Sequence, residues 1–249
     1  MEMTMKIDKN NPKNRLVLAL DVNKKEDALA LVRELKDYIG IFKIGLQLFT
    51  SYGPQIVQEI QSEGCKIFFD AKFHDIPNTV AKASDNIAKL GVDIFDIHVT
   101  GGSKMIKAAV KTAKNTAQKN DLEPPVMLGI TILSSLDQAF LNEELQIKYQ
   151  IDDYVLKLAT LAKNNGLDGV VASVREAAKI KETLGDSFVI LCPGIRPAWA
   201  DVNDQSRIAT PAEAIKQGAD FMVVGRPITQ AENRVEAAKK ILDEISSVI

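Results

Sequence analysis

Three charged side chains, Asp70, Lys72 and Asp75, follow an apolar run at residues 66–69. The run predicts a buried strand, and because strand side chains alternate between faces, Asp70 and Lys72 are expected to point the same way. Burying charge is costly unless it is paired, so one interpretation is a structural Asp–Lys ion pair at the end of a strand. One lysine does not require two carboxylates for neutralisation, however, and a packed acid–lysine–acid array is more typical of a functional site.

The chemistry open to this array follows from its charges. A lysine held among carboxylates stays protonated, because nearby negative charge favours the cation. Its ammonium can stabilise and protonate a carbanion, while the neighbouring carboxylates repel an anionic group of a substrate. This combination suits the loss of carbon dioxide without a cofactor, although the array is compatible with other reactions.

The elements that must position these residues alternate regularly between strand and helix. Apolar runs predict eight strands, at residues 16–20, 41–45, 66–70, 92–99, 126–133, 169–173, 188–193 and 221–225. Helices are expected between and after them, at residues 26–35, 54–61, 79–90, 103–117, 152–163, 175–184, 211–217 and 231–245. This alternation implies a parallel sheet, and eight units in 249 residues suit an α/β fold of the single (β/α)8 TIM barrel type. An open doubly wound sheet is the alternative, but no Gly-rich dinucleotide fingerprint follows the first strand.

The composition sets limits on domain organisation and partners. Residues 1–249 are expected to form one domain, with residues 1–14 as a polar N-terminal arm. A content of 46% hydrophobic and 26% charged residues is ordinary for a soluble globular protein, and the net charge of −2 argues against a dedicated nucleic-acid binder. No apolar run reaches membrane-spanning length, and the N-terminus lacks a signal-peptide core. A cytoplasmic protein with no nucleic-acid or membrane partner is therefore expected.

A TIM barrel places its catalytic groups at the carboxyl ends of the strands. Polar residues stand at the end of nearly every predicted strand: Asp21, Lys43, Asp70 with Lys72, His98, Ser134 with Ser135, Gly194, and Gly225 with Arg226. Asp21 and Lys43, on adjacent strands, either bind sugar hydroxyls and join the charged array or form a salt bridge at the barrel mouth. His74 and His98 are expected to be scaffold residues, and without matching carboxylate spacing they predict no metal site.

The segments 193–196 and 223–228 end the seventh and eighth strands, where TIM barrels often bind a phosphate. Glycines let the backbone approach a ligand closely, and an arginine can hold phosphate oxygens with two parallel hydrogen bonds. Together the segments favour a phosphorylated ligand over a tight turn with a solvated arginine. Two long connections, at residues 134–150 and 195–210, are either lids or plain surface insertions.

The segment 70–79 resembles the signature of the orotidine 5′-phosphate decarboxylase family in its monofunctional bacterial form. Its sequence is Asp-Ala-Lys-Phe-His-Asp-Ile-Pro-Asn-Thr. The similarity runs in order along nearly the whole chain, through residues 18–21, 42–45, 98–102, 131–135, 193–196, 204–205 and 223–226. The resemblance implies decarboxylation of orotidine 5′-phosphate to UMP and carbon dioxide, the final step of de novo pyrimidine nucleotide synthesis. It also implies that neither a metal nor an organic cofactor is needed.

The resemblance further implies roles for the residues of the charged array. Lys72 would donate a proton to C6 of the pyrimidine, and Asp70 would sit against the substrate carboxylate. Asp21 and Lys43 would bind ribose hydroxyls, with Lys43 completing the charge network.

Other roles implied by the resemblance lie outside the array. Asp75 and Thr79 would reach the site of a neighbouring subunit, so a homodimer is expected. Ser134 and Ser135 stand where the family often has Thr-Ser, and they would bind the substrate, Ser135 through a hydrogen bond to the pyrimidine. The phosphate would be held by Gln205, Gly225 and Arg226, with Arg196 beside them on a closing loop.

Two alternatives to this function remain from the sequence. Keto-gulonate-phosphate decarboxylases and hexulose-phosphate synthases share the Asp-x-Lys-x-x-Asp array but use magnesium. A non-catalytic barrel that binds phosphorylated ligands is the other alternative, and it would have no reason to retain an array of buried charges.

Overall fold

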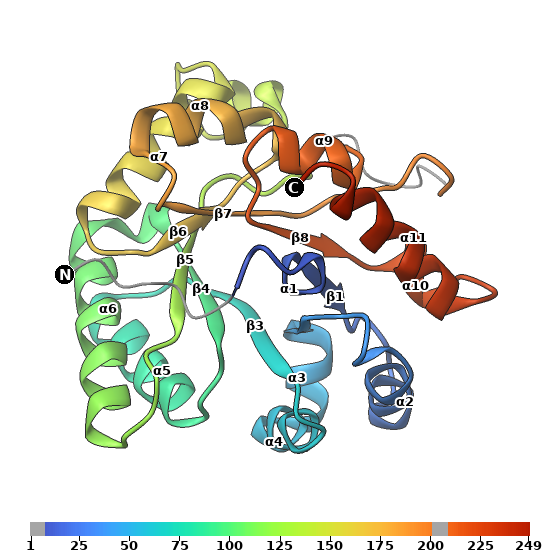
Figure 1. The fold of residues 1–249 in the computed structure, drawn as a ribbon. Helices are drawn as coiled ribbons and strands as arrows, with labels where there is room; N and C mark the ends of the chain where they lie inside the picture. Colours follow the sequence, from blue (N-terminus) through green and yellow to red (C-terminus); the bar gives the residue numbers. More distant parts are fainter. Residues whose placement is uncertain (1–7, 201–208) are drawn as a thin grey trace.

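The computed structural model describes residues 8–200 and 209–249. Eight parallel strands close into a barrel in the order β1 to β8, and β8 pairs with β1. The helices lie around the outside of the strands (Figure 1). This closed sheet confirms the predicted (β/α)8 TIM barrel and rules out the open doubly wound sheet.

Most strands are shorter than the apolar runs that predict them, and only β3 is clearly longer. The strands are β1 (Leu16–Ala19), β2 (Ile41–Gly45), β3 (Lys66–Phe73), β4 (Ile94–His98), β5 (Val126–Ile130), β6 (Gly169–Val171), β7 (Val189–Cys192) and β8 (Phe221–Val224). The last residues of several apolar runs leave the sheet and enter the loops above it. They therefore line the mouth of the barrel instead of extending its wall.

The helices follow the predicted pattern, with additional short helices. The main ones are α2 (Lys25–Leu35), α4 (Pro54–Ser62), α5 (Pro77–Lys89), α6 (Gly102–Lys119), α7 (Ile151–Asn164), α8 (Val174–Leu184), α9 (Pro211–Lys216) and α11 (Arg234–Ser246). Short helical segments that the sequence did not predict are α1 (Pro12–Arg15), α3 (Leu46–Tyr52), η1 (Val99–Gly101), η2 (Phe140–Glu144) and α10 (Arg226–Thr229). No helix in the described part of the chain is both long and apolar enough to cross a bilayer.

Strand alternation divides the apolar core into two layers. One layer fills the barrel and contains Val17, Ile41, Phe68, Ile94, Leu128, Val189, Leu191 and Phe221. The larger layer lies between strands and helices. Side chains two positions apart share a face of a strand. On β1 to β5, the residue two positions after the one that fills the barrel therefore belongs to the next layer toward the mouth. These residues are Ala19, Lys43, Asp70, Asp96 and Ile130, and all of them line a cavity.

A repeated Gly-x-Asp motif ties strands together at the amino end of the barrel. Each aspartate accepts a hydrogen bond of 2.8 Å from a backbone N–H of the preceding strand: Asp93 from Ile67, Asp168 from Met127, and Asp220 from Ile190. The three glycines, at positions 91, 166 and 218, have φ values of +67°, +89° and +95°, which L side chains rarely adopt. The motif therefore joins β3 to β4, β5 to β6 and β7 to β8 at the end opposite the predicted site.

The described part of the predicted N-terminal arm packs at the amino end of the barrel. Lys9 forms an ion pair with Asp220, and Nη1 of Arg15 donates a hydrogen bond of 3.2 Å to the carbonyl of Ala219. Arg15 is the last residue of helix α1, just after the predicted arm. The assignment of the whole chain to one domain with an arm at residues 1–14 stays a prediction.

Candidate active site

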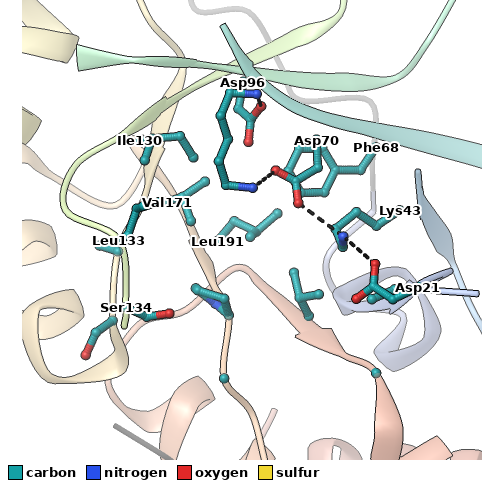
Figure 2. A pocket seen from close by; sticks show the side chains of 18 of the residues that line it. Asp21, Lys43, Phe68, Asp70, Asp96, Ile130, Leu133, Ser134, Val171 and Leu191 are labelled. Atoms are coloured by element: carbon teal, nitrogen blue, oxygen red, sulfur yellow. Dashed lines mark hydrogen bonds and ion pairs between the residues drawn. The ribbon is translucent and has the colours of Figure 1, made fainter. Parts of the chain in front are cut away.

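A cavity of about 520 Å³ lies at the carboxyl ends of the strands. This volume is within the usual range of small-molecule sites. Apolar walls and charged groups both contribute to it (Figure 2). Eight of the residues predicted for the site line the cavity: Asp21, Lys43, Asp70, Lys72, Ser134, Arg196, Gly225 and Arg226.

A continuous chain of ion pairs crosses one side of the cavity. Nζ of Lys43 lies 3.2 Å from Oδ1 of Asp21 and 3.1 Å from Oδ2 of Asp70, as the dashed lines in Figure 2 show. Nζ of Lys72 binds the other oxygen of Asp70, Oδ1. Lys43 and Asp70 are buried, whereas the side chain of Asp21 is 61% exposed. The buried carboxylate of Asp70 is therefore held between two ammonium groups.

The position of Lys43 follows from its place in β2. Ile41, two residues earlier, belongs to the inner core, so Lys43 points toward the barrel axis at the next layer. A Cβ atom added at Gly45 would lie 3.1 Å from Nζ of Lys43. The glycine therefore leaves room for the ammonium beside Asp70.

Charge pairing keeps the array ionised. Burial alone would raise the pKa of Asp70, but the positive charges of Lys43 and Lys72 outweigh it and lower the pKa to about 2. Burial alone would lower the pKa of Lys43, but the negative charges of Asp70 and Asp21 outweigh it and hold the pKa above its usual value. At neutral pH the cavity therefore contains a carboxylate and an ammonium that are both charged and shielded from bulk water.

A further buried carboxyl group, Asp96 on β4, lies against the array, and the sequence analysis missed it. Asp96 is 1% exposed, and its Oδ1 accepts a hydrogen bond of 2.8 Å from the backbone N–H of Lys72. Burial raises its pKa well above the usual value, and the negative charge of Asp70 and a hydrogen bond with Asp70 add to the shift. Burial and the neighbouring carboxylate therefore both favour the protonated form of Asp96. A sequence signal existed, because Asp96 stands two residues after Ile94 within an otherwise apolar strand.

The meeting of Asp70 and Lys72 depends on an irregularity in β3. The pairing of β3 with β4 changes register between Phe69 and Phe73. Within that interval Lys72 has a φ of +51°, in the left-handed region that non-glycine residues seldom occupy. Regular alternation therefore does not extend to Lys72. The two side chains meet as expected, but through a bulge in the strand.

The loops after β7 and β8 bring two arginines to the cavity. Arg196 is 6% exposed, and its backbone N–H donates a hydrogen bond of 2.9 Å to the carbonyl of Ala209, which joins the two ends of the predicted closing loop. Gly194 precedes it with a φ of +76°. Arg226 begins α10 directly after β8. The cavity therefore carries two groups of cations, one at β2 and β3 and the other after β7 and β8.

The other predicted site residues do not line this cavity within the described part of the chain. Ser135 is exposed next to Ser134. Asp75 is exposed and accepts a hydrogen bond of 2.6 Å from the backbone N–H of Ile76, and Thr79 is exposed in the first turn of α5. Gln205 lies outside the described residues.

The two histidines stack on each other near the mouth, with ring centroids 5.1 Å apart. Burial lowers the pKa of His98 to about 4, and the neighbouring charges of His74 and Lys72 contribute. Across residues 8–200 and 209–249, no group of three or more His, Cys, Asp or Glu side chains is arranged to hold a metal ion.

Comparisons with known proteins agree with this geometry. The model of the family described as Orotidine 5'-phosphate decarboxylase / HUMPS family matches residues 14–241. A protein named orotidine 5'-phosphate decarboxylase from Syntrophomonas wolfei subsp. wolfei is 50% identical over 232 residues, which cover 93% of this chain and 97% of that protein. One of the same name from Heliobacterium modesticaldum is 44% identical over 234 residues, covering 94% and 96%.

A solved structure is also similar over almost the whole chain. The crystal structure of orotidine 5'-phosphate decarboxylase from Lactobacillus acidophilus has a TM-score of 0.82 and 35% sequence identity, and the match covers 92% of this chain and 98% of that one. The identity of 50% to a relative across nearly the full length, together with the family match, shows the family. This chain belongs to the orotidine 5'-phosphate decarboxylase / HUMPS family.

Proposed function

We propose that this protein converts orotidine 5′-phosphate to UMP and carbon dioxide in the cavity at the carboxyl ends of the strands. The observation that carries the proposal is the array in which Lys43 and Lys72 hold the Asp70 carboxylate inside that cavity. The names of the similar proteins support it. The description of the matched family also includes HUMPS, so the family match alone does not separate the nucleotide enzyme from a magnesium-dependent sugar-phosphate enzyme. The names of the similar proteins favour the nucleotide enzyme.

The proposed reaction needs a proton and a site for developing negative charge. The bond between C6 and the carboxylate carbon breaks, carbon dioxide leaves, and the electron pair stays on C6. Lys72 then donates a proton from its ammonium to C6, which forms UMP, and the neutral amine regains a proton from water. An ammonium that is already oriented in a water-poor cavity stabilises the developing carbanion more strongly than it would in water.

Asp70 is proposed to contribute through repulsion. Its pKa of about 2 keeps it negatively charged, so a substrate carboxylate placed beside it is destabilised relative to the carbanion that follows. Binding energy from distant parts of the substrate, above all the phosphate, would offset the cost of this close approach.

The remaining cavity groups are proposed to bind the rest of the substrate. Arg196 and Arg226 supply positive charges that bind the phosphate. Gly225 has no side chain, so its backbone can approach the phosphate closely. Gln205 is also assigned to the phosphate. Ser134, which lines the cavity, and Ser135 beside it are assigned to the pyrimidine. Asp21, with its exposed side chain on the cavity wall, and Lys43 are assigned to the ribose hydroxyls.

A homodimer is part of the proposal. Asp75 and Thr79 are exposed and stand outside the cavity lining of their own chain, which supports their contributing to the site of a second copy. The exposed side chain of Ile76, 67% accessible, lies between them in sequence and offers apolar surface to such a copy. We also infer a cytoplasmic location from the expected place of the reaction in nucleotide synthesis.

The test is a direct assay of purified protein with orotidine 5′-phosphate in EDTA. Loss of orotate absorbance is followed while the product is identified by chromatography. Conversion to UMP at a rate that excess EDTA does not change supports the proposal and excludes a magnesium-dependent reaction.

Two results would reject the proposed reaction. A folded protein that binds UMP without any conversion would be a phosphate-ligand binder. Turnover of a sugar phosphate that requires magnesium, with none of orotidine 5′-phosphate, would assign the chain to the sugar-phosphate enzymes.

A further inference from the structure

The bulge in β3 leaves a gap in the hydrogen bonding between β3 and β4. Phe69 pairs with Phe95, and the next paired residues are Phe73 and Ile97, so β3 advances by four residues while β4 advances by two. The backbone of Lys72, inside this interval, has no register partner on β4. A buried backbone N–H without an acceptor is costly, so the bulge needs another group to accept from Lys72.

Asp96 supplies that acceptor from its side chain. Its Oδ1 accepts the N–H of Lys72 at 2.8 Å, which replaces the missing bond of the strand ladder. The bond acts on a residue whose φ is +51°, a conformation that a lysine seldom adopts without support from its surroundings.

Asp96 is also joined to Asp70, so the contacts form a closed ring. The backbone of Lys72 binds Asp96, the carboxyl of Asp96 hydrogen-bonds with Asp70, and Asp70 binds the ammonium of Lys72. Among the described residues no group donates a hydrogen bond to Oδ2 of Asp96, and a hydrogen bond between the carboxyl groups of Asp96 and Asp70 requires that one of them carry a proton. Both ends of Lys72, its backbone and its ammonium, are therefore held through the same buried carboxyl group.

We propose that Asp96 is a positioning residue for the reaction: it holds the β3 bulge and Asp70 together, so that the Lys72 ammonium stays aimed into the cavity. This inference rests on the proposed function, because it assigns to Lys72 the transfer of the proton. Asp96 lines the cavity, but the role proposed for it is to act on the reaction through Lys72 and Asp70.

The proposal distinguishes the shape of the Asp96 side chain from its charge. In Asp96→Asn, the amide oxygen accepts from the N–H of Lys72, and the amide nitrogen donates to Asp70 as the protonated acid does. In Asp96→Ala both bonds are lost. We expect Asp96→Asn to retain a kcat close to that of the wild type and Asp96→Ala to lose about 10²-fold, because a displacement of about 1 Å at a reacting group costs that much.

Substrate binding separates positioning from general damage to the site. The arginines that are proposed to bind the phosphate follow β7 and β8, away from Asp96 on β4, so the KM for orotidine 5′-phosphate and the Kd for UMP are expected to change little in Asp96→Ala. A crystal structure of Asp96→Ala is expected to show Lys72 with a negative φ and its ammonium withdrawn from Asp70.

Asp168→Ala is the matched control. Asp168 accepts a strand N–H, that of Met127, at the same distance of 2.8 Å, but at the opposite end of the barrel. We expect it to lower the free energy of unfolding while leaving kcat unchanged. An equal loss of kcat in both variants would reduce Asp96 to a residue that only stabilises the fold.

The possible results distinguish a failure of this inference from a failure of the proposed decarboxylation. Wild-type kcat in Asp96→Ala, with an active wild type, rejects the positioning role alone. A tenfold or greater loss in Asp96→Asn also rejects it, and this variant decides the matter if Asp96→Ala does not fold. An inactive wild type rejects the proposed function, and the conformation of Lys72 in the crystal structure of the variant then decides whether Asp96 holds the bulge.

Discussion

The ammonium of Lys43 lies 3.1 Å from Oδ2 of Asp70, while the other oxygen of that carboxylate binds Lys72. Lys43 reaches Asp70 because β2 and β3 are neighbours in the closed barrel, with Gly45 paired to Asp70 in register. The pair is buried, so each charge depends on the other for its stability. Lys43 is therefore both a structural partner of Asp70 and a group at the site.

Removing Lys43 should expose this dependence. We expect Lys43→Met to lower the free energy of unfolding at pH 7 by about 2 kcal/mol, because a buried carboxylate loses a charged hydrogen-bond partner. Urea denaturation measures the change. Asp21→Asn is the control: it removes only the exposed partner of Lys43 and should cost less than about 1 kcal/mol. Equal costs for the two variants would contradict the assigned importance of the Lys43–Asp70 pair.

Lys72→Ala should abolish turnover, because the proposed proton donor is lost, and yet leave a folded protein that binds UMP. Steady-state assays and calorimetric titration with UMP measure the two properties. Lys66→Ala is matched to it, since Lys66 lies on the same strand, pairs with Asp93 at the amino end and should leave kcat unchanged. Near-normal turnover in Lys72→Ala would remove Lys72 from the role of proton donor.

Arg226→Ala should weaken binding of phosphorylated ligands. We expect the Kd for UMP to rise about 30-fold, which corresponds to about 2 kcal/mol for one charged hydrogen-bonding group. Binding of uridine, which lacks the phosphate, should not change. Arg234→Ala, which removes an ion pair with Glu34 at the surface, serves as the control. Equal losses for UMP and uridine would place Arg226 outside the phosphate site.

A site completed by two chains predicts complementation between inactive variants. Asp75→Asn and Lys72→Ala proteins should each be inactive, and mixing them should restore part of the activity, because a heterodimer contains one intact site. Analytical ultracentrifugation and a labelled subunit verify that a dimer forms and that subunits exchange. If exchange occurs and no activity returns, Asp75 does not act in the neighbouring site.

His98 predicts a pH dependence of stability. Its pKa is about 4 in the folded protein, because of burial and the nearby charges of His74 and Lys72, against an ordinary value of 6.5. Between pH 6.5 and pH 4 the unfolded chain therefore binds a proton that the folded chain does not, so stability falls as the pH is lowered through this window. His98→Gln should reduce that fall in urea unfolding at pH 4.5, 5.5 and 7. Parallel profiles for variant and wild type would contradict the assignment.

The amino-acid sequence determined the barrel and, apart from Asp96, the charged residues that line the cavity. Apolar strands that alternate with amphipathic helices predict eight βα units, and the charges at the strand ends predict which side chains face the mouth. These features are local: each depends on the alternation of side chains within a few residues. Lys43, Asp70, Arg196 and Arg226 could therefore be placed at one end of the barrel before any contact was known.

Only the tertiary structure decided the role of Asp96 and the conformation of Lys72. Both depend on the register between β3 and β4, which is a relationship between segments far apart in the chain. The sequence showed an aspartate within an apolar strand, but it did not show that a bulge in the neighbouring strand leaves an N–H for that aspartate to accept. Burial beside a second carboxylate then favours its protonated form, because two negative charges cannot be held close together in a site of low polarity.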